Sequence, residues 1–388
     1  MHKKYRIELI LFLSYAVFAM SWIGATEFMV EIMQQSHMTS LAEASILSSA
    51  LLIAKVVGAF LAVYLMHKVG IYWAFAIALA MICFSIITPL ATNFLSLFAS
   101  RFIMGLGGAL ILVYFNPIVF ILFARRELAL VNGLNLCAFN FGMILIAYIR
   151  IDLVNFFGSW QLVLIVLSLI SLLLCFMWLL CSNISELDII SKVKQEHKDS
   201  FLSGFKHGYV WHYALTFAGL ISLYFVLFTF YQYARIVSIK ELGIWSLVGT
   251  VIGIICSQGL VKHLVLIRLS AILQLVSLTI LNFNHDPLMM KFSAILLSLV
   301  LSLPLPAMVT FVHNRANMTS QQLGMIFSLV YAISYLIATV VVFVFAKLVD
   351  FKHGDFTSAF IFICLINSMF LIGSLFLREN KVSAQAAC

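Results

Sequence analysis

The sequence predicts an all-helical membrane protein with twelve transmembrane helices. Hydrophobic residues make up 64% of its 388 residues, and the mean hydropathy is +1.11. Charged residues make up only 10%, against about a quarter in a soluble domain. Because the outside of a soluble fold must be largely polar, a water-soluble protein of this size could not bury so much apolar surface.

Twelve apolar runs are long enough to cross the hydrocarbon core, which takes about 20 residues. They cover residues 8–34, 41–66, 71–91, 94–124, 128–150, 160–181, 209–235, 241–261, 264–282, 288–313, 321–347 and 356–377. These runs are too long for the roughly ten-residue strands of an outer-membrane barrel, so a helical bundle is expected. The first run is also too long for a signal peptide and lacks a small-x-small cleavage site, which predicts a retained first helix.

The charged residues predict the topology. Twelve spans place both termini on one side, where fifteen of the 23 Lys and Arg residues fall, whereas six lie at the opposite ends. This bias predicts cytoplasmic termini in a bacterial inner membrane. Although the net charge is +8, the basic residues form short clusters between spans rather than one basic face, so no nucleic-acid partner is expected.

Other classes of protein lack their sequence signatures. The seven cysteines include no C-x-x-C pair, which argues against a disulfide framework and a zinc site. The chain has no G-x-x-x-x-G-K-[ST] or H-E-x-x-H motif and no clustering of Ser, His and Asp. We therefore do not expect an enzyme.

The longest polar stretch divides the chain near its midpoint. We expect an amino-terminal six-helix half (1–181), a cytoplasmic linker (182–207) and a carboxy-terminal six-helix half (208–388). Gly58 and Gly253 each precede a His and Lys pair by nine residues, and Pro117 and Pro306 each precede an Arg by nine. Two pseudo-symmetric halves are the parallel-repeat plan of a secondary transporter.

Four ionisable residues lie well inside the expected spans: Glu27, Glu31, Lys55 and Arg101. Such residues usually face a cavity or a charged partner and carry function. Glu27 and Arg101 are expected at a similar depth, where they could form a pair. A motion that separates this pair would change the proton affinity of Glu27, which predicts Glu27 as proton carrier and Arg101 as its switch. The alternative is a permanent pair that only holds helices together.

Lys55 lies near the midplane of the second expected span. A buried ammonium group is expected to pair with Glu27, to be neutral, or to be neutralised by an anionic group of the solute. Two carboxylates against two cations leave the amino-terminal half near neutral, which favours a zwitterionic or anionic solute. Glu31, one turn beyond Glu27, is expected near the lipid headgroups.

Uncharged polar and aromatic residues supply further candidates for solute contact. Asn116, Asn132 and Asn135 offer donors and acceptors at membrane depth, and hydrogen bonding between helices is an equally good explanation. The aromatic candidates are Tyr224, Phe228 and Tyr231, spaced i, i+4 and i+7, together with Tyr331 and Tyr335. Such stripes more often serve packing. Pro304 and Pro306 are expected to break or kink the tenth span.

Three stretches together resemble the major facilitator superfamily, specifically its drug:proton antiporter and sugar-efflux branch. GATEFMVE (24–31) resembles the first-helix G-x-T-E-F pattern, whose acidic residue matches Glu27. The segment 49–70 is similar to the second helix and the loop after it, and SRFIMGLGGA (100–109) matches R-x-x-x-G-x-G-G with Arg101. The resemblance implies a gating loop formed by Gly58, His67, Lys68 and Gly70.

The sequence also departs from this branch. His67 and Lys68 stand where the family usually has Asp and Arg, and the segment 140–152 lacks the fifth-helix Gly-Pro pattern of antiporters. At the position of Lys55 the family usually has a small or apolar residue. These departures favour a diverged solute.

The leading interpretation is a proton-coupled secondary transporter that moves a small organic solute by alternating access, with efflux as the expected direction. One alternative is uptake of a metabolite or a siderophore-like anionic or zwitterionic solute, and another is a membrane sensor or scaffold that does not transport. No cofactor is expected, since the proton gradient supplies the energy. The expected partners are the solute, protons and the lipid bilayer, with the chain acting as a monomer.

Overall fold

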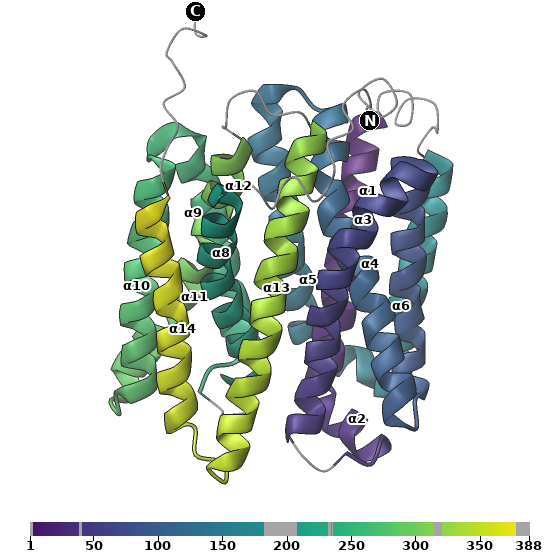
Figure 1. The fold of residues 1–388 in the computed structure, drawn as a ribbon. Coiled ribbons are helices and arrows are strands. Elements are labelled where there is room, and N and C mark those ends of the chain that lie inside the picture. Colours follow the sequence, from purple (N-terminus) through teal and green to yellow (C-terminus); the bar gives the residue numbers. More distant parts are fainter. Residues whose placement is uncertain are drawn as a thin grey trace, which may run out of the picture.

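The computed structural model describes residues 3–38, 41–181, 208–231, 234, 236–313 and 320–377. Every regular element in these ranges is a helix, and the helices stand side by side in one bundle (Figure 1). The amino-terminal helices are α1 (Lys3–Glu27), α2 (Met29–Gln35), α3 (Leu41–Cys83), the 3-10 helix η1 (Phe84–Leu90), α4 (Phe94–Leu122), α5 (Arg125–Phe157) and α6 (Trp160–Cys181). The carboxy-terminal helices are α8 (Gly208–Val226), the π-helical η3 (Leu227–Tyr231), α9 (Ile239–Ile255), the π-helical η4 (Cys256–Leu260), α10 (His263–Phe283), α11 (Pro287–Ser302), α12 (Pro304–His313), α13 (Ser320–Phe351) and α14 (Thr357–Phe376).

The described residues contain twelve membrane spans, which confirms the predicted fold class. Most span limits differ from the expected ones by a few residues. The first span is an exception, because it ends at Glu27 and residues 29–35 form the separate helix α2. The expected break in the tenth span lies between Ser302 and Pro304. The expected linker (182–207) lies outside the described residues, so the division into three segments stays a prediction.

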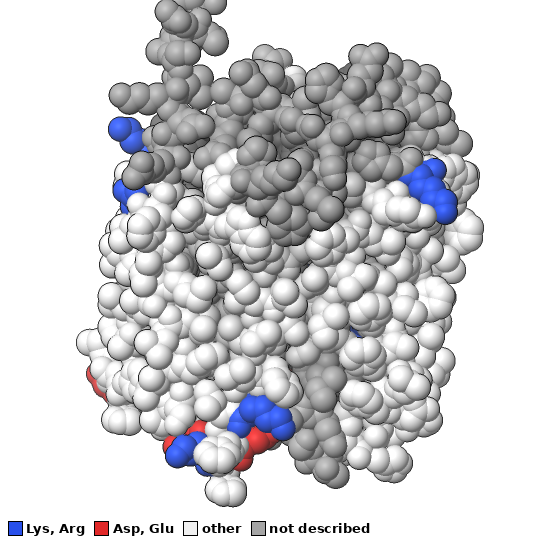
Figure 2. All heavy atoms as spheres, viewed as in Figure 1, with Lys and Arg blue, Asp and Glu red and all other residues white. Residues whose placement is uncertain are grey.

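Charge is confined almost entirely to the two ends of the bundle. On the face shown in Figure 2, Lys, Arg, Asp and Glu gather at the ends, and the wide band between them is nearly uncharged. The start of α1 and the end of α14 lie at the same end (Figure 1). We call this the terminal end and the other the opposite end. The uncharged band matches the apolar spans and is the surface that faces lipid.

Helices α1 and α5 run in parallel and are joined by an ion pair at each end. At the terminal end, Lys4 Nζ lies 3.0 Å from Glu127 Oε1. At the opposite end, Arg150 Nη1 lies 2.7 Å from Glu27 Oε2 and donates to the Glu27 carbonyl at 3.1 Å. Between these pairs, Gly142 lets α5 approach the Ala16 carbonyl so closely that a Cβ atom there would clash with it. These contacts fix the relative height and rotation of the two helices.

The amino-terminal and carboxy-terminal helices meet chiefly where α3 packs on α13 and α5 packs on α9. Along the second contact, Asn140 Nδ2 donates to Thr250 Oγ1 at 3.1 Å. Nearer the opposite end, Lys240 Nζ of α9 lies 4.8 Å from the ring centroid of Tyr148 on α5. The two groups of helices are therefore in contact from the middle of the bundle to its opposite end.

The expected gating loop forms a tight turn. Gly70, with φ 78° and ψ 162°, joins the second and third spans inside α3, and glycine adopts this conformation without steric cost. Lys68 Nζ donates to Tyr64 Oη at 3.1 Å on the preceding turn of its own helix. Gly58 packs against Ala109 of α4. The side chain of His67 lies outside the described part, and a gating role for these residues stays a prediction.

Replacing Gly142 with Ala is expected to destabilise the protein by about 1–3 kcal/mol, because the added methyl group would push α1 away from α5. The thermal unfolding midpoint of the purified protein in detergent measures this effect. Gly208→Ala is the matched control, since a Cβ at Gly208 meets no atom within 4 Å. Equal midpoints for the two variants would contradict the close packing of α1 on α5.

Candidate functional site

Lys55 lies at the centre of the molecule, surrounded by aromatic rings. Its side chain comes from α3 and is only 4% exposed. Nζ lies 4.8 Å from the ring centroids of Trp22 and Tyr335, 5.4 Å from Phe225 and 5.9 Å from Phe18. Trp22 and Phe18 belong to the amino-terminal helix α1, whereas Phe225 and Tyr335 belong to α8 and α13. The ammonium group therefore contacts both groups of helices.

The four rings belong to a continuous aromatic cluster. Trp22 stacks on Phe225 with 5.4 Å between centroids, and Phe225 meets Tyr335 edge-on at 6.0 Å. The cluster extends through Phe139 to Tyr224 and from Tyr335 to Tyr331. Aromatic side chains from four helices thus form the contact between the two groups of helices at this level.

The rings compensate part of the cost of burying this cation. A lysine at the centre of a membrane span costs about 2.5–3.5 kcal/mol on insertion scales, and one desolvated cation–π contact returns about 2 kcal/mol or more. The ion pairs among the described side chains are Lys4–Glu127 and Arg150–Glu27, so Lys55 does not form the pair with Glu27 that was one of the expected states. Its amine faces π-electron density, and no carboxylate among the described side chains pairs with it.

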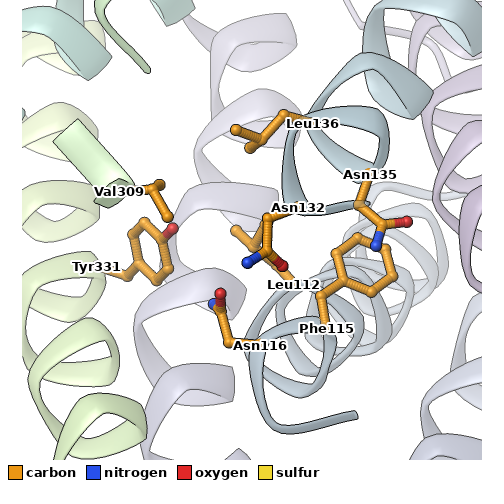
Figure 3. Close-up of a pocket in the computed structure, with 8 residues that line it drawn as sticks. All are labelled: Leu112, Phe115, Asn116, Asn132, Asn135, Leu136, Val309 and Tyr331. Carbon is orange, nitrogen blue, oxygen red and sulfur yellow. The ribbon is translucent and has the colours of Figure 1, made fainter. Parts of the chain in front are cut away.

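A small pocket lies between the halves beside this cluster, toward the terminal end. It is lined by Leu112, Phe115, Asn116, Asn132, Asn135, Leu136, Val309 and Tyr331. Figure 3 shows the side chains of Asn116 and Asn132 pointing toward each other, with Tyr331 facing them from α13. Asn135 points away from Tyr331. The structure therefore brings three predicted contact residues together, with neutral donors and acceptors that suit the polar part of a small solute.

Glu27 pairs with Arg150 in the structure, which corrects the expected pair with Arg101. Helical residues advance by about 100° each, so Glu27 lies about 140° around α1 from Trp22, which faces the centre. The Glu27 carboxylate therefore points toward α5. Its side chain is 5% exposed and that of Arg150 is 31% exposed. Because α1 ends at Glu27, this carboxylate also lies nearer the end of the bundle than expected.

Arg101 is left without a carboxylate partner among the described residues. It is 3% exposed, and its Nε and Nη1 atoms have no hydrogen-bond partner. Gly105, one turn further along α4, packs against Leu51 and Ala54 of α3. Arg101 thus lies on the face of α4 that meets α3, the helix that carries Lys55.

The aromatic stripe of the seventh span is divided by a change of helix type. Tyr224 and Phe228 lie together with 4.5 Å between their ring centroids, and Tyr224 Oη donates to Asn140 Oδ1 at 3.4 Å. Tyr231 instead donates to Asn282 Oδ1 at 2.7 Å. The π-helical segment η3 has more residues per turn than an α-helix, which turns Tyr231 away from this stripe and toward α10. A role for Tyr231 as a contact residue stays a prediction.

Sequence reasoning missed several residues of the site. Trp22, Phe18 and Phe225 lie in apolar runs and carry no signal of their own. From the sequence alone, Arg150 is expected at the membrane edge and not as the partner of Glu27. Arg150 and Glu27 are 123 residues apart, the same separation as that of Lys4 and Glu127. Glu8, at the edge of the first expected span, is 6% exposed and both carboxylate oxygens lack a hydrogen-bond partner. Its position near the start of that span concealed this burial.

Comparisons with known proteins identify the family. Residues 11–339 match the model of the Major Facilitator Superfamily. The uncharacterized protein Cj0987c of Campylobacter jejuni is 26% identical over 233 residues, which are 59% of this chain and 71% of that protein.

Two solved structures are similar in fold. The inward-open xylose transporter XylE from E. coli is 15% identical with a TM-score of 0.76, and the match covers 98% of both chains. The human organic anion transporter MFSD10 (TETRAN) is 13% identical with a TM-score of 0.68, covering 97% of this chain and 99% of that one. At these identities, the likeness shows the fold alone. Together with the family match, the twelve spans show that the chain belongs to the major facilitator superfamily and is a secondary transporter of a small solute, not an enzyme.

Proposed function

We propose that this transporter carries a small organic anion and binds its negative group at Lys55. The observation that carries this proposal is the buried ammonium group surrounded by four rings from both groups of helices. In alternating access, the bound solute must be held between two moving parts. An anion at Lys55 would touch both.

The charge balance of the amino-terminal helices supports an anion. The sequence predicts near neutrality, with Glu27 and Glu31 against Lys55 and Arg101. In the structure, however, Glu27 is bound to Arg150 and Glu31 is exposed on α2. Lys55 and Arg101 are therefore buried without a carboxylate partner among the described residues. A second cation at this place would be repelled, whereas an anion would form a charge-assisted contact.

The surrounding side chains favour a solute with an apolar or planar body. The rings at Lys55 offer stacking surfaces, and the nearby pocket offers the amides of Asn116 and Asn132. Such a combination of apolar walls and a few polar groups is typical of small-molecule sites. Human MFSD10, which is similar in fold, is an organic anion transporter, and this agrees with the proposed solute class.

The energy source proposed here is the proton gradient, with Glu27 as a coupling acid and Arg150 as the partner that competes with the proton. Arg101, the partner expected from the sequence, would then add a positive charge to the interior instead of pairing with Glu27. We propose export as the direction of transport, as the family resemblance implies. We place both termini in the cytoplasm, as the distribution of basic residues implies. Flux in right-side-out and inside-out vesicles with an imposed pH gradient tests both the coupling and the direction.

Lys55→Met is expected to weaken the binding of aromatic carboxylates by about 10- to 100-fold. The expected loss corresponds to one charge-assisted hydrogen bond of about 1.5–3 kcal/mol, and methionine keeps much of the apolar stem. Isothermal titration calorimetry of the purified protein with a panel of aromatic carboxylates and quaternary ammonium ions measures it.

The matched variant is Tyr335→Phe, which keeps the ring beside Lys55 and removes only the hydroxyl group, so carboxylate affinity should change little. Unchanged carboxylate affinity in Lys55→Met, with a loss of thermal stability alone, would make Lys55 a structural residue and remove the anion proposal.

Glu27→Gln should abolish solute accumulation driven by a pH gradient while leaving solute binding within about threefold of the wild type. Glutamine keeps the size of the side chain and removes the titrating group. Accumulation in proteoliposomes measures coupling, and calorimetry measures binding.

Glu31→Gln is the control for this variant, because Glu31 is the neighbouring acid on α2 and is exposed. Accumulation at the wild-type level in Glu27→Gln would reject Glu27 as a coupling residue.

A further inference from the structure

Besides Glu27, which lies near the opposite end, one more acidic side chain among the described residues is buried, and it lies near the terminal end of the bundle. Glu8 lies on α1 about 8 Å from its start, at 1.5 Å per residue, and is only 6% exposed. Neither Oε1 nor Oε2 has a hydrogen-bond partner. An ionised carboxylate in such a position would lose its hydration without a compensating partner, which is costly.

The polar side chain that lies against Glu8 is the amide of Asn135 on α5. Asn135 is 1% exposed, and its Oδ1 and Nδ2 atoms also lack hydrogen-bond partners. The carboxyl group of Glu8 and this amide lie within interaction range of each other. Native proteins rarely bury unpaired polar atoms, and here four of them are adjacent.

The other helices that pack on α1 bring no opposite charge to Glu8 among the described side chains. Helix α6 carries no Asp, Glu, Lys, Arg or His, and the one such residue of α4 is Arg101, nearer the opposite end. Lys4 and Glu127, one turn closer to the terminal end, bind each other. The side chains of Arg125 and Arg126 lie outside the described part.

Hydrogen-bond chemistry distinguishes the two forms of Glu8. A protonated carboxyl group can donate its O–H to Asn135 Oδ1 while its carbonyl oxygen accepts from Asn135 Nδ2, and this arrangement gives both atoms of the amide a partner. A carboxylate can accept from Asn135 Nδ2 but has no proton to donate, so it would leave Asn135 Oδ1 unpaired. A reciprocal pair that uses both amide atoms of Asn135 is therefore possible only for the protonated form.

We propose that Glu8 and Asn135 form a proton-binding site at the terminal end of the transporter, separate from Glu27. Glu8 lies on the same face of α1 as Tyr15 and Trp22, since a spacing of seven residues returns to within about 20°. Asn135 also lines the pocket with Asn116 and Asn132. The site thus connects the pocket with the terminal end of α1. Proton uptake there removes a negative charge from the interior that holds Lys55 and Arg101.

Infrared difference spectroscopy of the full-length protein in lipid tests this site without any solute. Wild-type protein should show the carbonyl stretch of a protonated carboxylic acid, which Glu8→Gln should lose and Glu8→Asp should retain. Raising the pH should remove the same band from the wild type. Absence of this band from the wild type, or its persistence in Glu8→Gln, would overturn the proposal. A wild-type protein that shows no such band but is stabilised by sodium ions would also overturn it, because the site would then bind sodium and not a proton.

Two further variants test the assigned partner. Asn135→Leu should shift the band to higher frequency, because the acid loses its hydrogen-bonding amide. Asn132→Leu is the matched control, since Asn132 lies three residues away on α5 and points toward Asn116 (Figure 3), and it should leave the band unchanged. Glu27→Gln should also leave it unchanged. A band with the same frequency in Asn135→Leu as in the wild type would contradict the pairing of Glu8 with Asn135.

Transport measurements separate this proposal from the proposed function. If the protein moves anions, Glu8→Gln should lose accumulation driven by a pH gradient while keeping solute exchange, because glutamine mimics the neutral acid. Full accumulation in this variant would overturn the role of Glu8 in coupling. If no anion is transported, the proposed solute class fails, whereas the infrared band still decides whether Glu8 binds a proton.

Discussion

The pairing of α1 with α5 positions most of the site. Ion pairs at both ends and the close approach at Gly142 leave α1 little freedom to slide or rotate. In that rotation, the residues on one face of α1 point toward Lys55 and the centre, while Glu27 points sideways into α5. A rotation of α1 would turn Glu27 toward the centre and the residues that face Lys55 toward α5. The packing that pairs Glu27 with Arg150 therefore also leaves Lys55 and Arg101 without an acidic partner among the described residues.

This arrangement explains why the interior is electrostatically unusual for a membrane protein. Buried charges are normally paired with one another or with backbone groups, yet the ammonium group of Lys55 faces rings and two nitrogens of Arg101 lack partners. A structural role alone would be served better by an apolar residue, since replacing buried ionic groups by well-packed apolar ones is often neutral or stabilising. The unpaired charges therefore favour a function that involves a mobile ion or solute.

The fold could be predicted almost completely from the sequence, because hydropathy alone reports which segments cross the membrane. The site could be predicted only in part. Charged residues such as Lys55 are conspicuous in apolar spans, but their partners depend on helix rotation, and the short helix α2 places Glu27 at the end of α1. Aromatic partners are inconspicuous in a sequence with 35 phenylalanines. The spacing misplaces Tyr231 because a π-helical segment changes the phase of its helix.

The position of the aromatic contacts suggests how solute binding and movement are linked. The rings at Lys55 come from α1, α8 and α13, so the halves cannot separate at this level without removing π-electron density from the ammonium group. Separation therefore costs more when the site is empty than when an anion remains attached to Lys55. By this argument the cation resists opening of the empty site and permits opening of the occupied one, which is the condition that limits leakage in a transporter.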